Sequence, residues 1–426
     1  MGPTSLLNAA AGEHGDWLAA IVNILFVCHR IPFPPKRGGK IRPFNMISHL
    51  AREHAVTVAS LARNEAEREA ASGLAEHCER VICEVISDVR AGFQMLARAP
   101  TSIPFSMGYF YSASLKRRIS QELRARAYDL IIVHCSSVAQ YVADVQGIPK
   151  ILDFGDMDSQ KWRLYANVRR FPMTVAYWLE AVKLEREERR LAQHFDLATC
   201  TTRQELDTLD SYQVARRTSW FPNGVDHEYF APYEEFDPDL VSFIGRMDYY
   251  PNQECVTRFC DDVWPLVRKH RPSTRFVIVG AEPPAAIRRL GSIQGVEVTG
   301  SVDDVRPYVA RSAVNVATLS VARGTQNKIL EAMAMGVPVV ASTVAAKGVD
   351  AVVGEHLLAA DEAEEIATQL LSVLDDPQRR QQLSTAGRAR VLSHHHWPES
   401  MKRLDVIVAD AMSEPIEKNQ ERVFEN

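Results

Sequence analysis

The chain has 426 residues, of which 46% are hydrophobic and 24% are charged, and its formal net charge is −5 at pH 7. This length exceeds what one hydrophobic core usually supports, so two domains are expected. The composition excludes collagen-like, disulfide-scaffold and wholly disordered chains. The negative charge argues against a globally basic nucleic-acid-binding protein, so no nucleic-acid partner is expected.

The seven cysteines are widely scattered and form no Cys-x-x-Cys pair. Neither a disulfide framework nor a zinc site is predicted, and a reducing cytosol fits best. Residues 1–20 contain charged residues and no apolar core, which predicts a disordered extension rather than a signal peptide. No stretch reaches the ~20 apolar residues of a spanning helix. We therefore expect a cytoplasmic protein whose membrane contact, if it has one, is peripheral.

Residues 21–220 predict an N-terminal α/β domain. Short apolar runs alternate with helical stretches, as in a parallel sheet covered on both faces. The predicted strands are Ile24–Cys28, Val56–Leu61, Arg80–Val85, Leu130–His134 and Lys150–Phe154. A Pro/Gly-rich loop and a helix over Ile41–Glu53 follow the first strand. Residues 161–195 predict a long helical segment that closes the domain.

Residues 221–395 predict a second domain of the same kind. Its predicted strands are Leu240–Ile244, Arg275–Val279, Val296–Thr299, Ala313–Ala317 and Val337–Ala341. The expected fold is two Rossmann-like, doubly wound parallel-sheet domains facing a central cleft, with ligands at the carboxyl ends of the strands. Residues 396–426 predict a terminal helix that packs back toward the first domain, followed by a polar tail.

The segment 323–338 contains the predicted start of a helix. Thr325 is the predicted N-cap, Gln326 the first helical residue, and Gly336 the residue that ends the helix. The first amides of a helix have no intrahelical acceptors, and the helix dipole is positive at this end. This helix start therefore predicts an anion site that fits a diphosphate.

The side chains at this helix start suit a nucleotide. Lys328 adds a positive charge, and Glu331 lies one turn further on, where a carboxylate can accept hydrogen bonds from a ribose diol. The predicted nucleotide contacts of this segment are Gly324, Thr325, Gln326, Asn327, Lys328 and Glu331. From position alone, an ordinary amphipathic helix with a solvated Lys328–Glu331 pair is an equal alternative.

The run from Leu330 to Ala341 resembles the donor-site signature of GT-B glycosyltransferases, specifically the large retaining family 4. Further similar segments follow in the order of the family, at Pro222–Asp226, Phe243–Arg246, Phe276–Gly280 and His396–Trp397. The resemblance implies the GT-B fold, a UDP- or GDP-sugar donor bound by the second domain, and sugar transfer with retention of configuration. The first domain would then present the acceptor.

Two N-terminal segments resemble a narrower group. Pro32–Arg42 and Asp153–Trp162 are similar to bacterial sugar transferases associated with exopolysaccharide and PEP-CTERM/exosortase loci. The resemblance implies a glycan, a polyprenyl-linked sugar or an exopolysaccharide precursor as acceptor. Peripheral contact with the inner face of the cytoplasmic membrane would suit such an acceptor.

The chain departs from the family at two positions. The family usually has a glutamate eight residues before Glu331, where this chain has Arg323, and a lysine five residues after Arg246, where it has Pro251. We hypothesise that Arg246 and Lys328, assisted by Arg323, neutralise the leaving diphosphate. A nucleotide-sugar 2-epimerase, or a nucleotide-sugar-binding assembly protein with impaired catalysis, remains an alternative.

Gly38 and Gly39 lie in the predicted loop after the first strand. Missing side chains there let backbone amides approach a phosphate or sugar, although any strand-to-helix turn can use glycine. The residues that make this loop basic are Lys36, Arg37, Lys40 and Arg42. They are expected either to meet an acceptor phosphate or anionic headgroup, or to be solvated charges.

His134 ends a predicted strand and is similar in position to the family histidine that lines the sugar pocket. The resemblance makes it a catalytic candidate with Arg246 and Lys328, and the alternative is a structural histidine at a strand end. Asp153 and Asp156 lie near the end of another predicted strand of this domain. They are expected with Arg323 in the acceptor or sugar pocket, and helix capping is the alternative for the aspartates.

No metal or other cofactor is predicted. Asp156 and Asp158 have the spacing of an Asp-x-Asp metal motif, but the donor features lie in the other half of the chain. The consecutive histidines 394–396 do not converge on one ion without further ligands.

Overall fold

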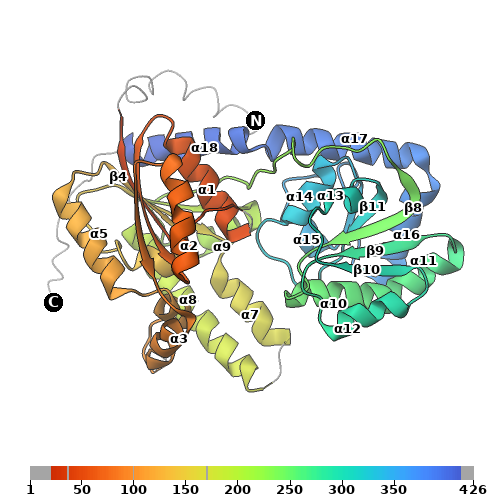
Figure 1. The fold of residues 1–426 in the computed structure, drawn as a ribbon, viewed down its shortest axis with the longest axis horizontal. Helices are drawn as coiled ribbons and strands as arrows, with labels where there is room; N and C mark the ends of the chain where they lie inside the picture. Colours follow the sequence, from red (N-terminus) through yellow and green to blue (C-terminus); the bar gives the residue numbers. More distant parts are fainter. Residues whose placement is uncertain (1–20, 36–37, 99, 169–170, 414–426) are drawn as a thin grey trace. The chain divides into compact units, whose positions relative to one another are not determined.

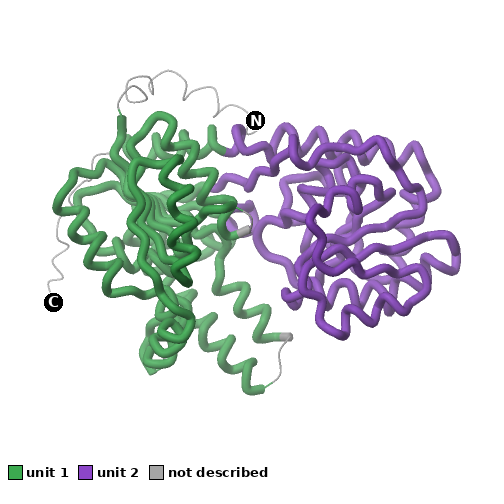
Figure 2. The backbone as a smooth tube through the Cα atoms, in the orientation of Figure 1, with its two compact units in different colours: residues 1–200, 208–219, 401–426 green, residues 201–207, 220–400 purple. Residues whose placement is uncertain are grey.

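The computed structural model describes residues 21–35, 38–98, 100–168 and 171–413, in two compact α/β units (Figure 1). Unit 1 comprises the described residues within 1–200, 208–219 and 401–426, and unit 2 comprises 201–207 and 220–400 (Figure 2). The predicted extension 1–20 and the tail beyond residue 413 lie outside the described residues. No described helix is both long and apolar enough to cross a bilayer.

Unit 1 is built on a seven-stranded sheet with the order β3-β2-β1-β4-β5-β6-β7. The strands are β1 (Asn23–Cys28), β2 (Ala55–Ala62), β3 (Arg80–Val85), β4 (Leu130–His134), β5 (Lys150–Gly155), β6 (Leu197–Cys200) and β7 (Thr218–Trp220). The pairs from β3 to β6 are parallel. The strand order reverses between β1 and β4, and ligands of open α/β sheets bind outside such a switch point.

Unit 2 is built on a six-stranded parallel sheet with the order β10-β9-β8-β11-β12-β13. The strands are β8 (Asp237–Ile244), β9 (Arg275–Val279), β10 (Val296–Gly300), β11 (Ser312–Ala317), β12 (Val339–Ala341) and β13 (Leu358–Ala359). Its switch point lies between β8 and β11. The loops after these two strands are therefore the first place to look for a ligand site.

Helices cover the sheets of both units (Figure 1). The helices that begin before residue 220 are α1 (Gly38–Leu50), α2 (Glu65–Ala70), α3 (Asp88–Ala97), α4 (Phe105–Tyr109), α5 (Ala113–Ala125), α6 (Ser136–Ala139), α7 (Asp158–Val168), α8 (Met173–His194) and α9 (Arg203–Ser211). Those that follow are α10 (Tyr250–Arg258), α11 (Trp264–His270), α12 (Ala285–Arg289), α13 (Arg306–Val309), α14 (Asn327–Ala334), α15 (Thr343–Ala346), α16 (Ala363–Asp375), α17 (Pro377–His394) and α18 (Trp397–Ser413).

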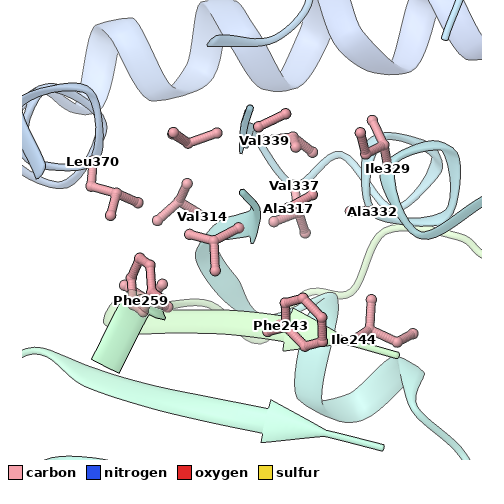
Figure 3. Close-up of a cluster of buried hydrophobic side chains, with 14 of the residues drawn as sticks. Phe243, Ile244, Phe259, Val314, Ala317, Ile329, Ala332, Val337, Val339 and Leu370 are labelled. Atoms are coloured by element: carbon pink, nitrogen blue, oxygen red, sulfur yellow. The ribbon is translucent and has the colours of Figure 1, made fainter. Parts of the chain in front are cut away.

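The core of unit 2 holds α14 against the sheet. Side chains from β8, β11, α14 and α16 meet in one buried cluster, which includes Phe243, Val314, Ile329 and Leu370 (Figure 3). Ile329 and its neighbour Leu330 are fully buried. Burying a large aliphatic side chain contributes about 1.5–3 kcal/mol, so these two residues fix the polar start of α14 at the edge of the sheet.

Every strand predicted from the sequence is present, with small shifts at the ends. The predicted helical segment 161–195 is two helices, α7 and α8. The short strands β6, β7 and β13 were not predicted. Gly336 has φ +73° and follows the end of α14, as expected for a helix-terminating glycine.

Helix α18 packs on unit 1 from residue 401 onward. Its buried side chains recur at helical spacing: Met401, Leu404, Ile407, Val408 and Ala411. His49 Nε2 lies 2.7 Å from Asp405 Oδ1, which joins α18 to α1. At the start of the helix, Trp397 lies so close to Gly224 that a Cβ on this glycine would be 2.6 Å from the indole ring.

Candidate functional site

Two glycines bring the ends of β8 and β9 together in unit 2. A Cβ on Gly280 would lie 1.9 Å from the carbonyl oxygen of Gly245, and a Cβ on Gly245 would lie 2.7 Å from Asn252 Nδ2. Real Cβ atoms do not approach so closely, so both positions require glycine. The loop from Gly245 to Asn252 is consequently packed tightly at the strand ends, beside the switch point.

Helix α14 begins one residue later than expected. Its N-cap is Gln326, which makes no side-chain capping bond to the helix, so the prediction of a Thr325 cap is wrong by one residue. Gly324 has φ +63° and turns the chain before the helix. Gln326 Nε2 donates to the carbonyl oxygens of Arg323 and Gly324, at 3.1 and 3.3 Å, and so stabilises this turn instead of capping the helix.

Two polar atoms at the start of α14 are buried without a partner. Thr325 Oγ1 and Asn327 Oδ1 have no hydrogen bond in the described part of the chain. Most buried side-chain polar atoms in proteins are hydrogen-bonded, so each such atom calls for an explanation. The first amides of the helix also lack intrahelical acceptors. A polar ligand or water at this point would satisfy both kinds of group.

Lys328, the second residue of α14, adds an ammonium group to the same helix start. Nζ donates to Asn252 Oδ1 at 2.5 Å and lies 4.7 Å from the centre of the Phe243 ring. Burial lowers the pKa of Lys328 to about 8, against the opposing effects of Cys255 and Glu331. The group is still cationic at neutral pH, in surroundings where its charge is weakly screened.

Glu331 lies one turn further along α14. Burial raises the pKa of Glu331 to about 7, and the charge of Lys328 opposes this effect. Burial and Lys328 are the only influences on this carboxyl among the described residues, and no hydrogen bond contributes. A cation and an available carboxylate thus lie side by side at the helix start.

Arg246 follows β8 and faces solvent with 44% of its side chain exposed. Its guanidinium donates to Asp248 at 3.1 and 2.9 Å and to Glu282 at 2.9 Å. Exposed ion pairs contribute little stability, so an anionic ligand can displace these carboxylates. Arg246 is therefore available to a diphosphate only in competition with its own neighbours.

Arg323 is paired with Glu205, the second residue after the start of α9. Nε lies 2.8 Å from Oε1 and Nη2 lies 3.1 Å from Oε2, and the two side chains are only 15% and 0% exposed. The charge of Arg323 is therefore compensated by a buried carboxylate, and its expected place in an acceptor or sugar pocket stays a prediction. Removing either partner would leave the other charge buried, which is strongly destabilising.

In unit 1, His134 and Arg42 meet at Asp153 beside the switch point. His134 Nδ1 lies 2.7 Å from Asp153 Oδ2, and Arg42 donates to both carboxylate oxygens at 2.8 and 3.0 Å. Thr199 Oγ1 donates to Oδ1 at 2.9 Å. Asp153 is 0% exposed, so the expectation that it contacts an acceptor is wrong. Its carboxylate instead orients the His134 ring.

The groups around Asp153 keep its carboxyl ionised. Burial alone would raise the pKa of Asp153, but Arg42 and the hydrogen bond from His134 hold it well below its usual range. Because the ionised carboxylate can only accept, Nδ1 of His134 is the donor in this hydrogen bond. Burial and the nearby His134 lower the pKa of His29 to about 3, so this second imidazole is neutral.

The glycines after β1 do not form a loop. Gly38 and Gly39 are the first residues of α1, and a Cβ on Gly39 would lie 3.9 Å from His29 Nε2. Since Gly39 is exposed beside His29, it leaves the backbone of the helix start accessible at the strand ends.

The two described cations of the predicted basic loop, Lys40 and Arg42, are both paired with carboxylates. Lys36 and Arg37 lie outside the described residues. Lys40 pairs with Glu67 at 3.3 Å, and Arg42 is buried against Asp153. The expectation of a basic surface is therefore wrong for Arg42, whose charge is used inside unit 1.

The candidate metal motifs do not assemble a site. Asp156 is half-buried in the turn after β5, and Asp158 begins α7 and lies 3.8 Å from Lys161. His395 contacts Asn223 and the amide of Asp350, whereas the rings of His396 and His227 are 4.4 Å apart. Within the described ranges, no three His, Cys, Asp or Glu side chains form a group that could hold an ion.

Four residues at these sites were missed by sequence reasoning: Glu205, Asn252, Thr199 and His29. Asn252 follows Pro251, which occupies the first turn of α10, and a proline there signals a helix start but not a contact with Lys328. Arg323 and Glu205 are 118 positions apart in the sequence, and a contact over such a separation cannot be predicted from a local sequence pattern.

Two family models match the chain in succession. "Glycosyltransferase Family 4" matches residues 37–229, and "Glycosyl transferases group 1" matches residues 238–376. The chain carries both domains of a GT4-type glycosyltransferase. A sequence search found no match among curated proteins.

Solved structures show that this glycosyltransferase-type chain has the GT-B fold. Anabaena HepE in complex with UDP has a TM-score of 0.65 at 16% identity, over 91% of this chain and 100% of that chain. The sucrose-phosphate synthase of Thermosynechococcus elongatus has a TM-score of 0.67 at 16% identity, over 91% and 98%. A putative UDP-N-acetylglucosamine 2-epimerase from Listeria monocytogenes has a TM-score of 0.57 at 14% identity, over 93% and 98%.

Proposed function

We propose that the chain is a glycosyltransferase that moves a sugar from a UDP- or GDP-sugar to a glycan, a polyprenyl-linked sugar or an exopolysaccharide precursor. The observation that carries this proposal is the start of α14, where residues 325–328 combine the Lys328 ammonium, two buried polar atoms without a described partner and amides without a side-chain cap. Such a helix start favours a phosphate group. The complexes of HepE with UDP and with UDP-glucose support a uridine nucleotide as the first ligand to try.

The proposed donor contacts follow from the chemistry of each group. The amides at Asn327 and Lys328, together with the Lys328 ammonium, take the diphosphate, whose negative charge grows as the sugar leaves. Glu331 accepts hydrogen bonds from the ribose diol. Arg246 exchanges its exposed carboxylate partners for a phosphate. His134 takes a hydroxyl of the transferred sugar through Nε2.

The proposed reaction needs no metal and retains the configuration of the sugar. The cation at Lys328 and the α14 amides would supply the charge compensation that a divalent ion supplies in other sites. Transfer that persists in EDTA supports this proposal, and strict dependence on Mg²⁺ or Mn²⁺ contradicts it. The anomeric configuration of the product, determined by NMR, tests retention.

We further propose that the acceptor is reached at an anionic membrane surface on the cytoplasmic side. Helix α3 exposes Val89, Phe93 and Leu96, at 71%, 71% and 65%, on one face. An exposed line on α8 contains Val175, Trp178 and Val182. The exposed cations Arg90 and Arg186 lie on the same two helices. Apolar and aromatic faces flanked by cations are typical of interfacial helices.

The test begins with binding and then measures turnover. Thermal shifts with UDP, GDP and their sugars identify the donor, because a ligand that binds the folded state raises its stability. Hydrolysis and transfer are then measured with purified protein. Sugar transfer to an added acceptor supports the proposal. Nucleotide release from donor alone, without any acceptor dependence, indicates a 2-epimerase, and tight binding without turnover indicates an assembly protein.

A further inference from the structure

The side chain of Asn252 links the Lys328 ammonium to the backbone of Arg246 at the end of β8. Its Nδ2 donates to the carbonyl oxygen of Arg246 at 2.7 Å, and its Oδ1 accepts from Lys328 Nζ at 2.5 Å. The residue is only 4% exposed, although it lies in the first turn of α10. A buried amide with both ends occupied has one orientation, because exchanging oxygen and nitrogen would break both hydrogen bonds.

The packing around Asn252 removes other positions for its amide. A Cβ on Gly245 would lie 2.7 Å from Nδ2 and 2.9 Å from Cγ, so the glycine backbone is directly against the side chain. On its far side, the Lys328 ammonium rests over the ring of Phe243. The amide therefore sets the position of Nζ relative to the end of β8.

The two cations have partners of different charge. Arg246 is held by the carboxylates of Asp248 and Glu282, which compensate its charge. Lys328 is held by a neutral amide, and Glu331 acts on it only through space. An amide orients an ammonium group without cancelling its charge, whereas a carboxylate would do both. The uncompensated charge of this pair is therefore at Lys328.

We propose that Asn252 is a positioning residue of the donor site, which holds the Lys328 ammonium in place with a neutral acceptor and so keeps its full charge for a nucleoside diphosphate. This inference rests on the proposed function for its ligand. In this proposal Asn252 contacts neither the phosphate nor the sugar, and it affects the donor only through Lys328.

Two variants separate position from charge. Asn252→Asp keeps the shape and the acceptor for Lys328 but adds a negative charge. Asn252→Leu keeps the approximate volume but removes both hydrogen bonds. The matched control is Gln253→Glu, which makes the same charge change one residue along, where the side chain bonds only to the carbonyl of Met247 at 2.6 Å.

The affinity for UDP and for GDP is measured by calorimetry between about pH 6 and 10 in the full chain. Loss of one charge-assisted contact corresponds to an affinity loss of about tenfold or more. We expect this loss at pH 7 for Asn252→Asp and Asn252→Leu, and a much smaller change for Gln253→Glu.

The pH profile distinguishes positioning from a general structural effect. In wild type, affinity falls as pH rises through about 8, where Lys328 loses its proton. A carboxylate beside the ammonium raises the pKa of Lys328, so Asn252→Asp moves this alkaline loss to higher pH. Removing the acceptor lowers the pKa, so Asn252→Leu moves it to lower pH. Opposite shifts do not arise from simple loss of packing.

A second measurement tests the contact between Asn252 and Lys328 in the absence of nucleotide. NMR titration of the Lys328 ammonium in labelled protein is expected to show the pKa rise in Asn252→Asp and fall in Asn252→Leu. Identical Lys328 titrations in all three proteins would overturn the inference. Absence of UDP and GDP binding to wild type would contradict the proposed function, while the Lys328 titration would still decide whether Asn252 controls this ammonium group.

Discussion

Lys328 and Glu331 lie one helical turn apart in surroundings that disfavour charge on both. Burial lowers the pKa of Lys328 to about 8 and raises that of Glu331 to about 7, so the doubly ionised pair exists only over a narrow interval around neutral pH. Because the two groups interact, they titrate as a pair. The proposed donor site is therefore expected to be sensitive to pH in the range where most enzymes are assayed.

Lys328→Ala should reduce turnover by about 10²–10³-fold, because it removes a cation from the place where charge develops. Lys269→Ala, on an exposed turn of α11, is the control and should be neutral. Steady-state kinetics measure the effect and thermal unfolding checks the fold. In wild type, donor affinity should decline as pH rises through about 8. Unchanged kinetics in Lys328→Ala would contradict the proposed role.

His134→Ala should lower transfer by about 10²-fold while leaving UDP binding intact, because its imidazole lies in unit 1 and the proposed diphosphate contacts lie in unit 2. Kinetics and calorimetry with the same preparation measure the two effects. His270→Ala, at the exposed end of α11, serves as the control. An equal loss of binding and transfer would indicate a purely structural histidine.

The helices α7 and α8 are joined by a buried carboxylate. Glu188, on α8, is 0% exposed and accepts from the amide and hydroxyl of Ser159, at 2.9 and 2.5 Å, and from the hydroxyl of Tyr212 at 3.0 Å. Burial raises the pKa of Glu188 to about 8 despite these hydrogen bonds. The start of α7 is thus held by a group that titrates above neutral pH.

The sign of the resulting pH dependence follows from linkage. The folded state holds the Glu188 proton up to about pH 8, whereas the unfolded chain releases it near the ordinary value of 4.5. The stabilisation is complete below the unfolded pKa and is lost as pH rises through the folded pKa. Wild-type Tm should therefore fall between pH 5 and 8 relative to that of Glu188→Gln, which cannot ionise.

Calorimetric melting of Glu188→Gln and of Glu187→Gln over this range tests the prediction. Glu187 pairs with Arg190 nearby on the same helix, at 2.6 Å, and provides a matched control. We expect Glu187→Gln to follow wild type. Parallel Tm curves for wild type and Glu188→Gln would show that Glu188 is ionised throughout.

The strands were predictable because buried strands have a recognisable local sequence pattern. Strands β4 and β11 are buried on both faces, so they appear as continuous apolar runs bounded by polar segments. Strands β6 and β13 were missed because four and two residues are too short for such a run. The start of α14 was misplaced because Gly324, at φ +63°, adds a turn that residue types alone do not reveal.

The candidate site was only partly predictable for a different reason. Lys328 and Glu331 lie on one helix, and their spacing is visible in the sequence. Their neighbours come from distant segments: Arg42 and Asp153 are 111 positions apart, and Lys328 and Asn252 are 76 apart. Asp153 was expected at an acceptor but is buried. Its ion pair with Arg42 was not foreseen, because Arg42 was predicted to lie in a basic surface loop.

For the molecule as a whole, the exposed apolar faces of α3 and α8 predict binding to anionic vesicles. Phe93→Ser and Trp178→Ser should each weaken cosedimentation with vesicles containing an anionic lipid, by several-fold, because each removes a large interfacial side chain. Val406→Ser is the control, since Val406 is 67% exposed on α18. Equal binding of the three variants, or equal binding to uncharged vesicles, would contradict the proposal.

Because the last described residues, 401–413, belong to unit 1, the two units can be completed only in a fixed order during synthesis. Unit 2 draws almost all of its residues from one continuous stretch, 220–400, whereas unit 1 also needs 401–413, which contribute the buried side chains of Leu404 and Ile407. A ribosome therefore releases everything that unit 2 needs before it releases the last piece of unit 1. The unit whose translation begins first is therefore completed last, and a nascent chain that has emerged from the ribosome only as far as residue 400 would have all residues of unit 2 but not all residues of unit 1.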